Sequence, residues 1–264
     1  MNTEIKSKTD IKTKSDWSPE HISAFWDWLS LNKAMSDKYF TRMVGNGLCR
    51  IMTSHFALKG NVLDYGCGEG TFLKILLEKK LQIDLYGLEF SDNSAQITER
   101  KLKDSDWFRG VEVARALPSN YQESTFDNIS FFETIEHLKD DILDDTLKEI
   151  YRLLKPGGKL IVTTPFDEDL TDNTVYCPFC NSEFHHMQHM QSFNKESITE
   201  LLEIYGFKVF YCQDVSILLE YELSTLHKFI YSFKGYTKRI LSNLGIGTHN
   251  KVSKKPNLVL IATK

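Results

Sequence analysis

The sequence has few of the features that mark membrane-spanning or disulfide-rich proteins. No apolar run approaches the roughly 20 residues that a helix needs to cross a bilayer. The first 16 residues are rich in Lys, Thr, Ser and Asp and contain no apolar signal core. The five cysteines are an odd number in a chain of 264 residues, so we expect reduced thiols rather than a disulfide framework. We therefore predict a cytoplasmic protein with a disordered tail over residues 1–16.

The composition suits a single α/β domain. Hydrophobic residues make up 41% of the chain and charged residues 26%, which is ordinary for a globular protein of this length. Short apolar runs alternate with stretches of helical periodicity, so we predict a doubly wound parallel sheet with right-handed crossovers. The predicted domain, 17–264, comprises an N-terminal helical cap (17–57), a ligand-binding core (58–165), a small insertion (166–193) and a basic helical insertion (214–255).

The most informative segment is the nonapeptide 62–70, Val-Leu-Asp-Tyr-Gly-Cys-Gly-Glu-Gly. Its apolar run ends at the carboxylate of Asp64, and a helix-compatible stretch begins at Thr71. Glycines occupy three alternate positions between them: Gly66, Gly68 and Gly70. Glycine permits a sharp turn with positive φ and lets a ligand approach the backbone. A strand, a glycine turn and a helix in this order predict a nucleotide-like ligand at the carboxyl end of a parallel strand.

The glycine spacing resembles motif I of the class I S-adenosylmethionine (SAM)-dependent methyltransferases. Two further segments resemble the same family in the expected order. Phe-Phe-Glu-Thr-Ile-Glu-His-Leu at 131–138 is similar to its fourth motif, and Lys-Pro-Gly-Gly at 155–158 is similar to the turn before its fifth strand. The resemblance covers about residues 60–165. It implies a Rossmann-like sheet of seven strands, with the last two strands as an antiparallel pair at one edge.

The resemblance also implies how SAM is held. Asp64 would bind the amino group of the methionine portion, directly or through water, and Glu89 would chelate the ribose hydroxyls. Around the adenine the chain departs from the family, because Val113 stands where relatives carry an Asp ahead of the Leu-Pro pair that begins at Leu117. Either Glu112 takes that role or backbone groups recognise the base alone. The expected cofactor-binding residues are Asp64, Gly66, Cys67, Gly68, Gly70, Glu89, Phe90, Leu117 and Glu133.

Methyl transfer from a sulfonium is an in-line displacement, and positioning inside a dry site supplies much of its acceleration. A hydroxyl acceptor must also lose its proton. His137 follows the predicted fourth strand and titrates near neutrality, so it is the candidate general base. Glu133 and Glu136 are weaker candidates. The alternative is that His137 only packs against the cofactor or caps the next helix.

A second group of residues lies in the predicted insertion after the fifth strand. Cys177 and Cys180 form a Cys-x-x-Cys knuckle, and His185 and His189 are spaced i, i+4. Together they predict a closed tetrahedral zinc site with a structural role, although His186 would fit as well as His185. Some bacterial methyltransferases carry a similar Cys-Pro-x-Cys insertion. The alternative is a loop with two inert thiols beside a surface cluster of histidines.

The segment 224–255 contains seven Lys or Arg residues and no Asp or Glu. Its mixture of basic and aromatic residues suits peripheral contact with a membrane surface or binding of an anionic glycan. A lid helix with solvated lysines would explain the same pattern. Nucleic acid is not an expected partner, because the remainder of the chain is acidic and no aromatic RNA-binding motif is present.

These features predict a SAM-dependent methyltransferase that acts on a small molecule or on a glycan or lipid-linked acceptor. O-methylation is the first expectation, with N- and C-methylation open. Two other functions stay open. A dinucleotide-dependent oxidoreductase would also use an acidic residue at Glu89, but its fingerprint needs a third glycine where this chain has Thr71. A non-catalytic, methyltransferase-like interaction module is the other.

Overall fold

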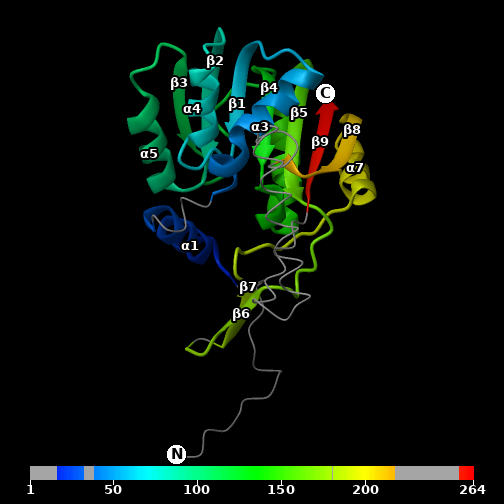
Figure 1. Cartoon of the computed structure of the whole chain (residues 1–264). Coiled ribbons are helices and arrows are strands. Elements are labelled where there is room, and N and C mark those ends of the chain that lie inside the picture. Colours follow the sequence, from blue (N-terminus) through cyan, green and yellow to red (C-terminus); the bar gives the residue numbers. More distant parts are fainter. Residues whose placement is uncertain (1–16, 33–38, 180, 218–255) are drawn as a thin grey trace, which may run out of the picture.

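The computed structural model describes residues 17–32, 39–179, 181–217 and 256–264 (Figure 1). Its centre is a sheet of seven strands in the order β3-β2-β1-β4-β5-β9-β8. The strands of this sheet are β1 (Gly60–Tyr65), β2 (Ile83–Glu89), β3 (Phe108–Val113), β4 (Phe126–Phe132), β5 (Leu154–Pro165), β8 (Lys208–Val215) and β9 (Asn257–Thr263). A separate hairpin of β6 (Thr174–Cys177) and β7 (Ser182–His185) extends below the sheet in Figure 1.

Two hydrophobic clusters attach the helices to the two faces of this sheet. The helices are α1 (Pro19–Leu31), α3 (Phe40–His55), α4 (Thr71–Glu78), α5 (Asp92–Leu102), α6 (Asp140–Leu153) and α7 (Lys195–Ile204). Apolar residues of α3, α4 and α5 belong to one cluster, and those of α6 and α7 belong to the other. Within the described part of the chain, no helix has the length and apolar character needed to cross a membrane.

The strand directions confirm the predicted fold. β1 pairs in parallel with β2 and β4, whereas β9 pairs antiparallel with both β5 and β8. The sheet is therefore doubly wound, with an antiparallel pair at one edge. The register places Asp64 of β1 opposite Gly87 of β2 and Ser130 of β4. Because the carboxyl ends of parallel strands meet at one edge, the loops after β1, β2 and β4 converge.

The local sequence explains where several helices begin. Ser18 caps α1, since its hydroxyl accepts a hydrogen bond from the backbone N–H of His21, and Asn194 caps α7 by accepting from the N–H of Ser197 at 2.8 Å. Serine and asparagine are both residue types that favour the N-cap position. The predicted tail (1–16) and nearly all of the basic insertion lie outside the described residues.

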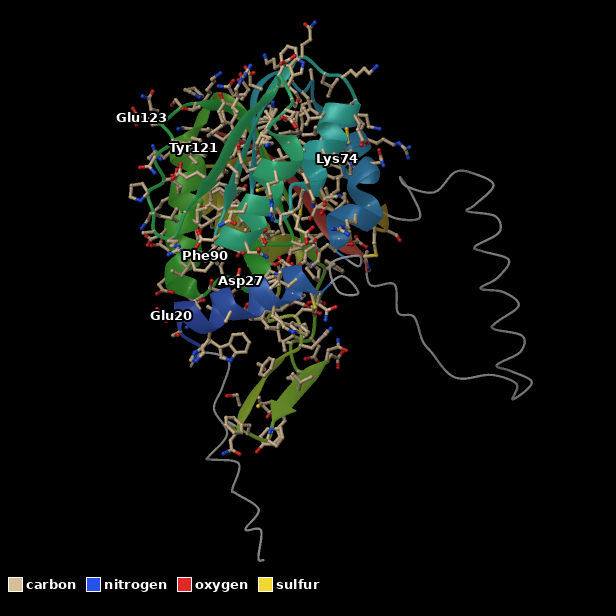
Figure 2. The ribbon with its side chains drawn as sticks, turned by 90° about the vertical axis from the view of Figure 1, so that its left-hand side faces the viewer. Glu20, Asp27, Lys74, Phe90, Tyr121 and Glu123 are labelled. Carbon is tan, nitrogen blue, oxygen red and sulfur yellow. The ribbon has the colours of Figure 1, made fainter. Side chains whose placement is uncertain are left out.

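Helix α1 lies against the end of β2 and the start of α5. The Ser91 hydroxyl donates to Asp27 Oδ1 at 2.6 Å, and Asn93 Nδ2 donates to the Ser30 hydroxyl at 2.7 Å. Figure 2 shows Asp27 on this helix close to Phe90. The N-terminal cap therefore covers the carboxyl end of the sheet, which is the side where a ligand is expected.

Strand β9 is central to stability, because it lies between β5 and β8 and its Leu260 is fully buried. We expect Leu260→Ala to lower the free energy of unfolding by about 2–5 kcal/mol through lost burial and a residual cavity. Chemical denaturation followed by circular dichroism measures the change. Ile204→Ala is the matched control, since Ile204 is 78% exposed, and we expect a change within about 0.5 kcal/mol. An equal loss of unfolding free energy in both variants would contradict the central role of β9 in stability.

Candidate functional site

The glycine loop connects β1 to α4 and lies against the segment that follows β4. Gly66, Gly68 and Gly70 all have positive φ, at 77°, 53° and 69°. A Cβ added at Gly66 would lie 2.6 Å from the hydroxyl of Thr134, so only glycine fits this approach. The contact brings two of the sequence motifs, 66–70 and 131–138, to one place at the carboxyl edge of the sheet.

The space beside Gly68 is open. Apart from Gly68 itself and its two chain neighbours, no heavy atom of the described chain lies within 4 Å of the position that its Cβ would take. Its backbone N–H donates to Glu89 Oε2 at 2.7 Å, which fixes the loop against the end of β2. The loop therefore leaves space beside Gly68 while its backbone is held in place, as a cradle for a ligand requires.

Asp64 is only 3% exposed, at the end of β1. Its Oδ1 accepts a hydrogen bond from the hydroxyl of Ser130 at 2.7 Å. Burial raises the pKa of the carboxyl to about 7, although the Ser130 hydrogen bond acts in the opposite direction. A cationic group placed beside this carboxylate would stabilise the charged form.

Glu89 at the end of β2 accepts two backbone hydrogen bonds. One comes from Gly68 and the other from the N–H of Ser91 at 3.0 Å. Burial raises its pKa, and the backbone hydrogen bonds oppose that shift. Glu89 thus connects the glycine loop to the start of α5. A carboxylate oxygen has more than one lone pair, so this position is compatible with hydrogen bonds to ribose hydroxyls as well.

The residues predicted to surround the adenine differ in their exposure. Phe90 is 36% exposed and Leu117 is half-buried, so both present apolar surface at this edge. The thiol of Cys67 is buried against Gly87, so Cys67 offers a ligand only its backbone. Glu112 is already engaged, because its Oε1 accepts two hydrogen bonds from Asn120. Of the two alternatives that the sequence left open, the geometry favours backbone recognition of the base.

The segment after β4 carries two carboxyl groups, that of Glu133, which is partly exposed, and that of Glu136, which is buried. Both oxygens of Glu133 accept from Asn257 Nδ2 of β9 at 3.1 Å, which connects the end of β4 to β9. The expected role of Glu133 in cofactor binding stays a prediction. Burial, followed by the negative charge of Glu168, raises the pKa of Glu133 to about 8. Burial and then Glu133 raise the pKa of Glu136 well above its usual range.

His137 lies in the short 3-10 helix η3 (Ile135–His137) and is enclosed by aromatic rings. Its ring contacts that of Trp26 at 4.7 Å and that of His189 at 4.8 Å between centroids. Its Nδ1 donates to the backbone carbonyl of Gln188 at 3.4 Å. Burial, and then the neighbouring His189, lower the pKa of His137 to about 3. Such a side chain stays neutral and accepts a proton poorly, which argues against its predicted role as the general base.

The hairpin register separates two of the predicted zinc ligands, Cys177 and His185. In the β6–β7 hairpin Cys177 pairs with Ser182, whereas His185 pairs with Thr174. Cys177 and Thr174 are three residues apart, which corresponds to about 10 Å along a strand, and an odd separation turns their side chains to opposite faces. A tetrahedral ion with bonds of about 2.0–2.3 Å does not reach both ligands. Cys180 lies outside the described residues.

The two predicted histidines do come together, with a carboxylate that the sequence did not indicate. The rings of His185 and His189 stack at 4.5 Å between centroids. Glu168 lies beside both, with 2.5 Å between its Oε2 and His189 Nδ1 and 3.7 Å between its Oε1 and His185 Nε2. Both histidines are buried, so the alternative of a surface histidine cluster is also wrong for them, whereas His186 is exposed.

Sequence analysis missed Trp26, Glu168 and Asn257, three residues of this region. Glu168 follows β5, and its position after a strand was the one available signal, because loops after parallel strands share an edge. Trp26 and Asn257 come from α1 and β9, more than 100 residues from His137 and Glu133 in the sequence, and no local pattern connects them.

Comparisons with known proteins show which family the chain resembles. A family model described as a methyltransferase domain matches residues 39–211. A probable S-adenosylmethionine-dependent methyltransferase of Mycolicibacterium smegmatis is 26% identical over 156 residues, which cover 59% of this chain and 55% of that protein. A demethylmenaquinone methyltransferase of Lactiplantibacillus plantarum is 32% identical over 114 residues, covering 40% of this chain and 46% of that protein. The chain thus spans about half the length of these curated relatives.

A solved structure is similar over nearly its whole length. The 1,6-didemethyltoxoflavin-N1-methyltransferase of Burkholderia thailandensis, with bound 1,6-didemethyltoxoflavin and S-adenosylhomocysteine, has a TM-score of 0.60 and 17% identity. The alignment covers 94% of this chain and 91% of that chain, and it shows a shared fold. The matched segment, 39–211, includes the glycine loop, Glu89 and the segment after β4. The chain therefore belongs to the methyltransferase domain family.

Proposed function

We propose that this chain is a SAM-dependent methyltransferase that uses the glycine loop as its cofactor site. The observation that carries the proposal is the open space beside Gly68, in a loop that follows the buried Asp64 and is held by the partly exposed Glu89. SAM has a cationic amino group and two ribose hydroxyls, and these are suitable partners for two carboxylates. A dinucleotide-dependent oxidoreductase is disfavoured, because the family match and Thr71 in place of a third fingerprint glycine both point elsewhere.

The described residues fit the proposed cofactor in three ways. Asp64 would hold the amino group, since a cation beside a buried carboxyl offsets the burial that raises its pKa to about 7. Glu89 would accept from the ribose hydroxyls while it keeps the glycine loop in position. Phe90 and Leu117 would supply apolar surface for the adenine, with the backbone near Val113 recognising its polar edge.

When bound, SAM supplies an electrophilic methyl group, whose bond to sulfur breaks as the bond to the acceptor forms, with the electron pair remaining on sulfur. The chain's own contribution is to orient the reactants and exclude water. Helix α1 supports that role, because Asp27 binds Ser91 and Trp26 packs on His137 at the same edge of the sheet.

For the acceptor we propose O-methylation of a small molecule or of a glycan or lipid-linked compound. Glu133 is then a better candidate than His137 for removing the hydroxyl proton. Its pKa of about 8 lies near neutrality, whereas that of His137 is about 3. The relative from L. plantarum is named for demethylmenaquinone, so a C-methylated acceptor is the second candidate. Peripheral membrane contact through 224–255 stays a prediction, because that segment lies outside the described residues.

The first prediction concerns cofactor binding. We expect SAM and S-adenosylhomocysteine to bind the purified chain in isothermal titration calorimetry, and NAD not to bind. Asp64→Asn removes a charge-assisted hydrogen bond, so the affinity for both sulfur ligands should fall about 10- to 100-fold. Asp106→Asn, at an exposed position, is the control and should bind as the parent does. Binding of NAD but of neither sulfur ligand would overturn the proposed function.

A second prediction follows from the pKa of Asp64, which burial raises to about 7 in the ligand-free protein. Only the ionised carboxylate attracts the amino group, so affinity should increase as the pH rises through 7. Between pH 6 and pH 8 the ionised fraction grows about tenfold, and the affinity for S-adenosylhomocysteine should grow by a similar factor.

The Asp64→Asn variant separates this effect from other titrations. Its affinity for S-adenosylhomocysteine should change little over the same pH range, because the amide does not titrate. A pH dependence that is unchanged in this variant would show that another group is responsible.

A further inference from the structure

Three side chains gather beside the glycine loop in the arrangement of metal ligands. Glu136 and His137 come from η3, and His189 comes from the loop between β7 and α7. Each offers one donor atom, and the three donor atoms lie within 4.8 Å of one another. Ligand atoms bound to one ion at about 2.1 Å are roughly 3–4 Å apart, so a small movement would complete the coordination.

Both histidines have their Nδ1 atoms engaged by oxygen acceptors. His137 Nδ1 lies 3.4 Å from the carbonyl oxygen of Gln188, which can only accept. His189 Nδ1 lies 2.5 Å from Glu168 Oε2. A proton on Nδ1 would leave Nε2 of each ring for a metal ion. Histidines that bind metals are oriented in this way, by a carbonyl or carboxylate at the other ring nitrogen.

Glu136 provides an independent indication of a missing partner. Its side chain is 1% exposed, and neither carboxylate oxygen accepts a hydrogen bond of good geometry within the described part of the chain, although the Thr164 hydroxyl lies close to it. His137 Nε2 is 3.8 Å from Oε1, which is longer than a hydrogen bond. The side-chain amide of Gln188, also 1% exposed, likewise has no hydrogen-bond partner among the described residues. Buried polar groups rarely stay unsatisfied, and a bound ion would satisfy the carboxylate.

We propose that Glu136, His137 and His189 bind a divalent transition-metal ion. Two imidazoles and one carboxylate suit Zn²⁺ or a similar first-row ion better than Mg²⁺, which prefers oxygen ligands. Glu168 acts as the outer partner that orients His189, because its carboxylate is already bonded to Nδ1. The cation would also offset the repulsion among the neighbouring carboxyl groups of Glu133, Glu136 and Glu168.

Three protein ligands leave coordination positions open for water or for an oxygen of the acceptor. The ion lies close to the proposed cofactor site, because Thr134, two residues before Glu136, contacts Gly66 of the glycine loop. This part of the inference rests on the proposed function. A metal ion lowers the pKa of a bound hydroxyl, so it would prepare an oxygen acceptor for methylation without a strongly basic side chain.

The test measures metal binding in the absence of SAM and acceptor. The full chain is treated with a chelator, and Zn²⁺ or Co²⁺ is then titrated by calorimetry, with Co²⁺ also followed by visible absorption. We expect one ion per chain and no competition by excess Mg²⁺. His189→Ala and the isosteric Glu136→Gln should each weaken binding by at least about tenfold. Zn²⁺ should raise the melting temperature of the parent more than that of Glu136→Gln.

Two control variants make the test specific to this site. His186→Ala changes an exposed histidine three residues from His189, and Cys177→Ser changes the hairpin thiol. Both should bind Zn²⁺ as the parent does. The proposal is overturned if the parent binds no ion, or if either control loses as much affinity as His189→Ala. Should His189→Ala fail to fold by circular dichroism, Glu136→Gln decides the question.

Failure of this inference is distinguishable from failure of the proposed function. A chain that binds S-adenosylhomocysteine but no Zn²⁺ would overturn the metal site alone. A chain that binds Zn²⁺ through these ligands but neither sulfur ligand would overturn the proposed function and leave the metal site supported.

Discussion

Buried carboxyl groups at one edge of the sheet are the constraint on which the candidate site depends. Parallel pairing brings the ends of β1, β2 and β4 together, and each carries a carboxyl group there: Asp64, Glu89 and Glu133. Burial raises the pKa of all three. Ionised carboxylates in such surroundings are costly unless they are paired. A positive charge at this edge would therefore stabilise the ionised carboxylates, and this is the place where a cationic cofactor would bind.

The carboxyl groups along this edge differ in their hydrogen-bond partners. Glu89 is stabilised by backbone N–H groups, and Glu133 by the amide of Asn257. Asp64 has the Ser130 hydroxyl as a neutral partner, which leaves room for a cation. The carboxylate oxygens of Glu136 have no hydrogen-bond partner among the described residues. Carboxylates with several hydrogen-bond donors hold the loops in place. Carboxylates with few or no donors are the positions where we expect ligands to bind.

Local sequence patterns were sufficient for the fold and for the glycine loop. The run that ends at Asp64, its alternate glycines and the helix from Thr71 all form a single continuous unit, and a continuous unit can be recognised from its own residues. The N-caps Ser18 and Asn194 were predictable for the same reason, since a cap acts within three residues of itself.

The predicted zinc ligands show that spacing in the sequence alone does not establish a site. The Cys-x-x-Cys pair and the two histidines are neighbours in the sequence, but the hairpin register places Cys177 and His185 on opposite faces. His189 instead contacts distant segments, at His137 after β4 and Glu168 after β5, and Trp26 on α1 packs on His137. Burial also argues against the expected role of His137, because desolvation lowers its pKa in a way that no sequence pattern reports.

The burial of Cys67 has a consequence for how the protein tolerates chemical stress. This thiol lies in the middle of the glycine loop, yet it packs onto Gly87 of β2, and burial raises its pKa well above the usual range. Oxidants and alkylating agents react with an accessible thiolate, not with a buried thiol. A cysteine at the centre of the proposed cofactor loop is thus shielded from oxidation by the same strand that positions Glu89, and the loop needs no reducing partner to stay intact.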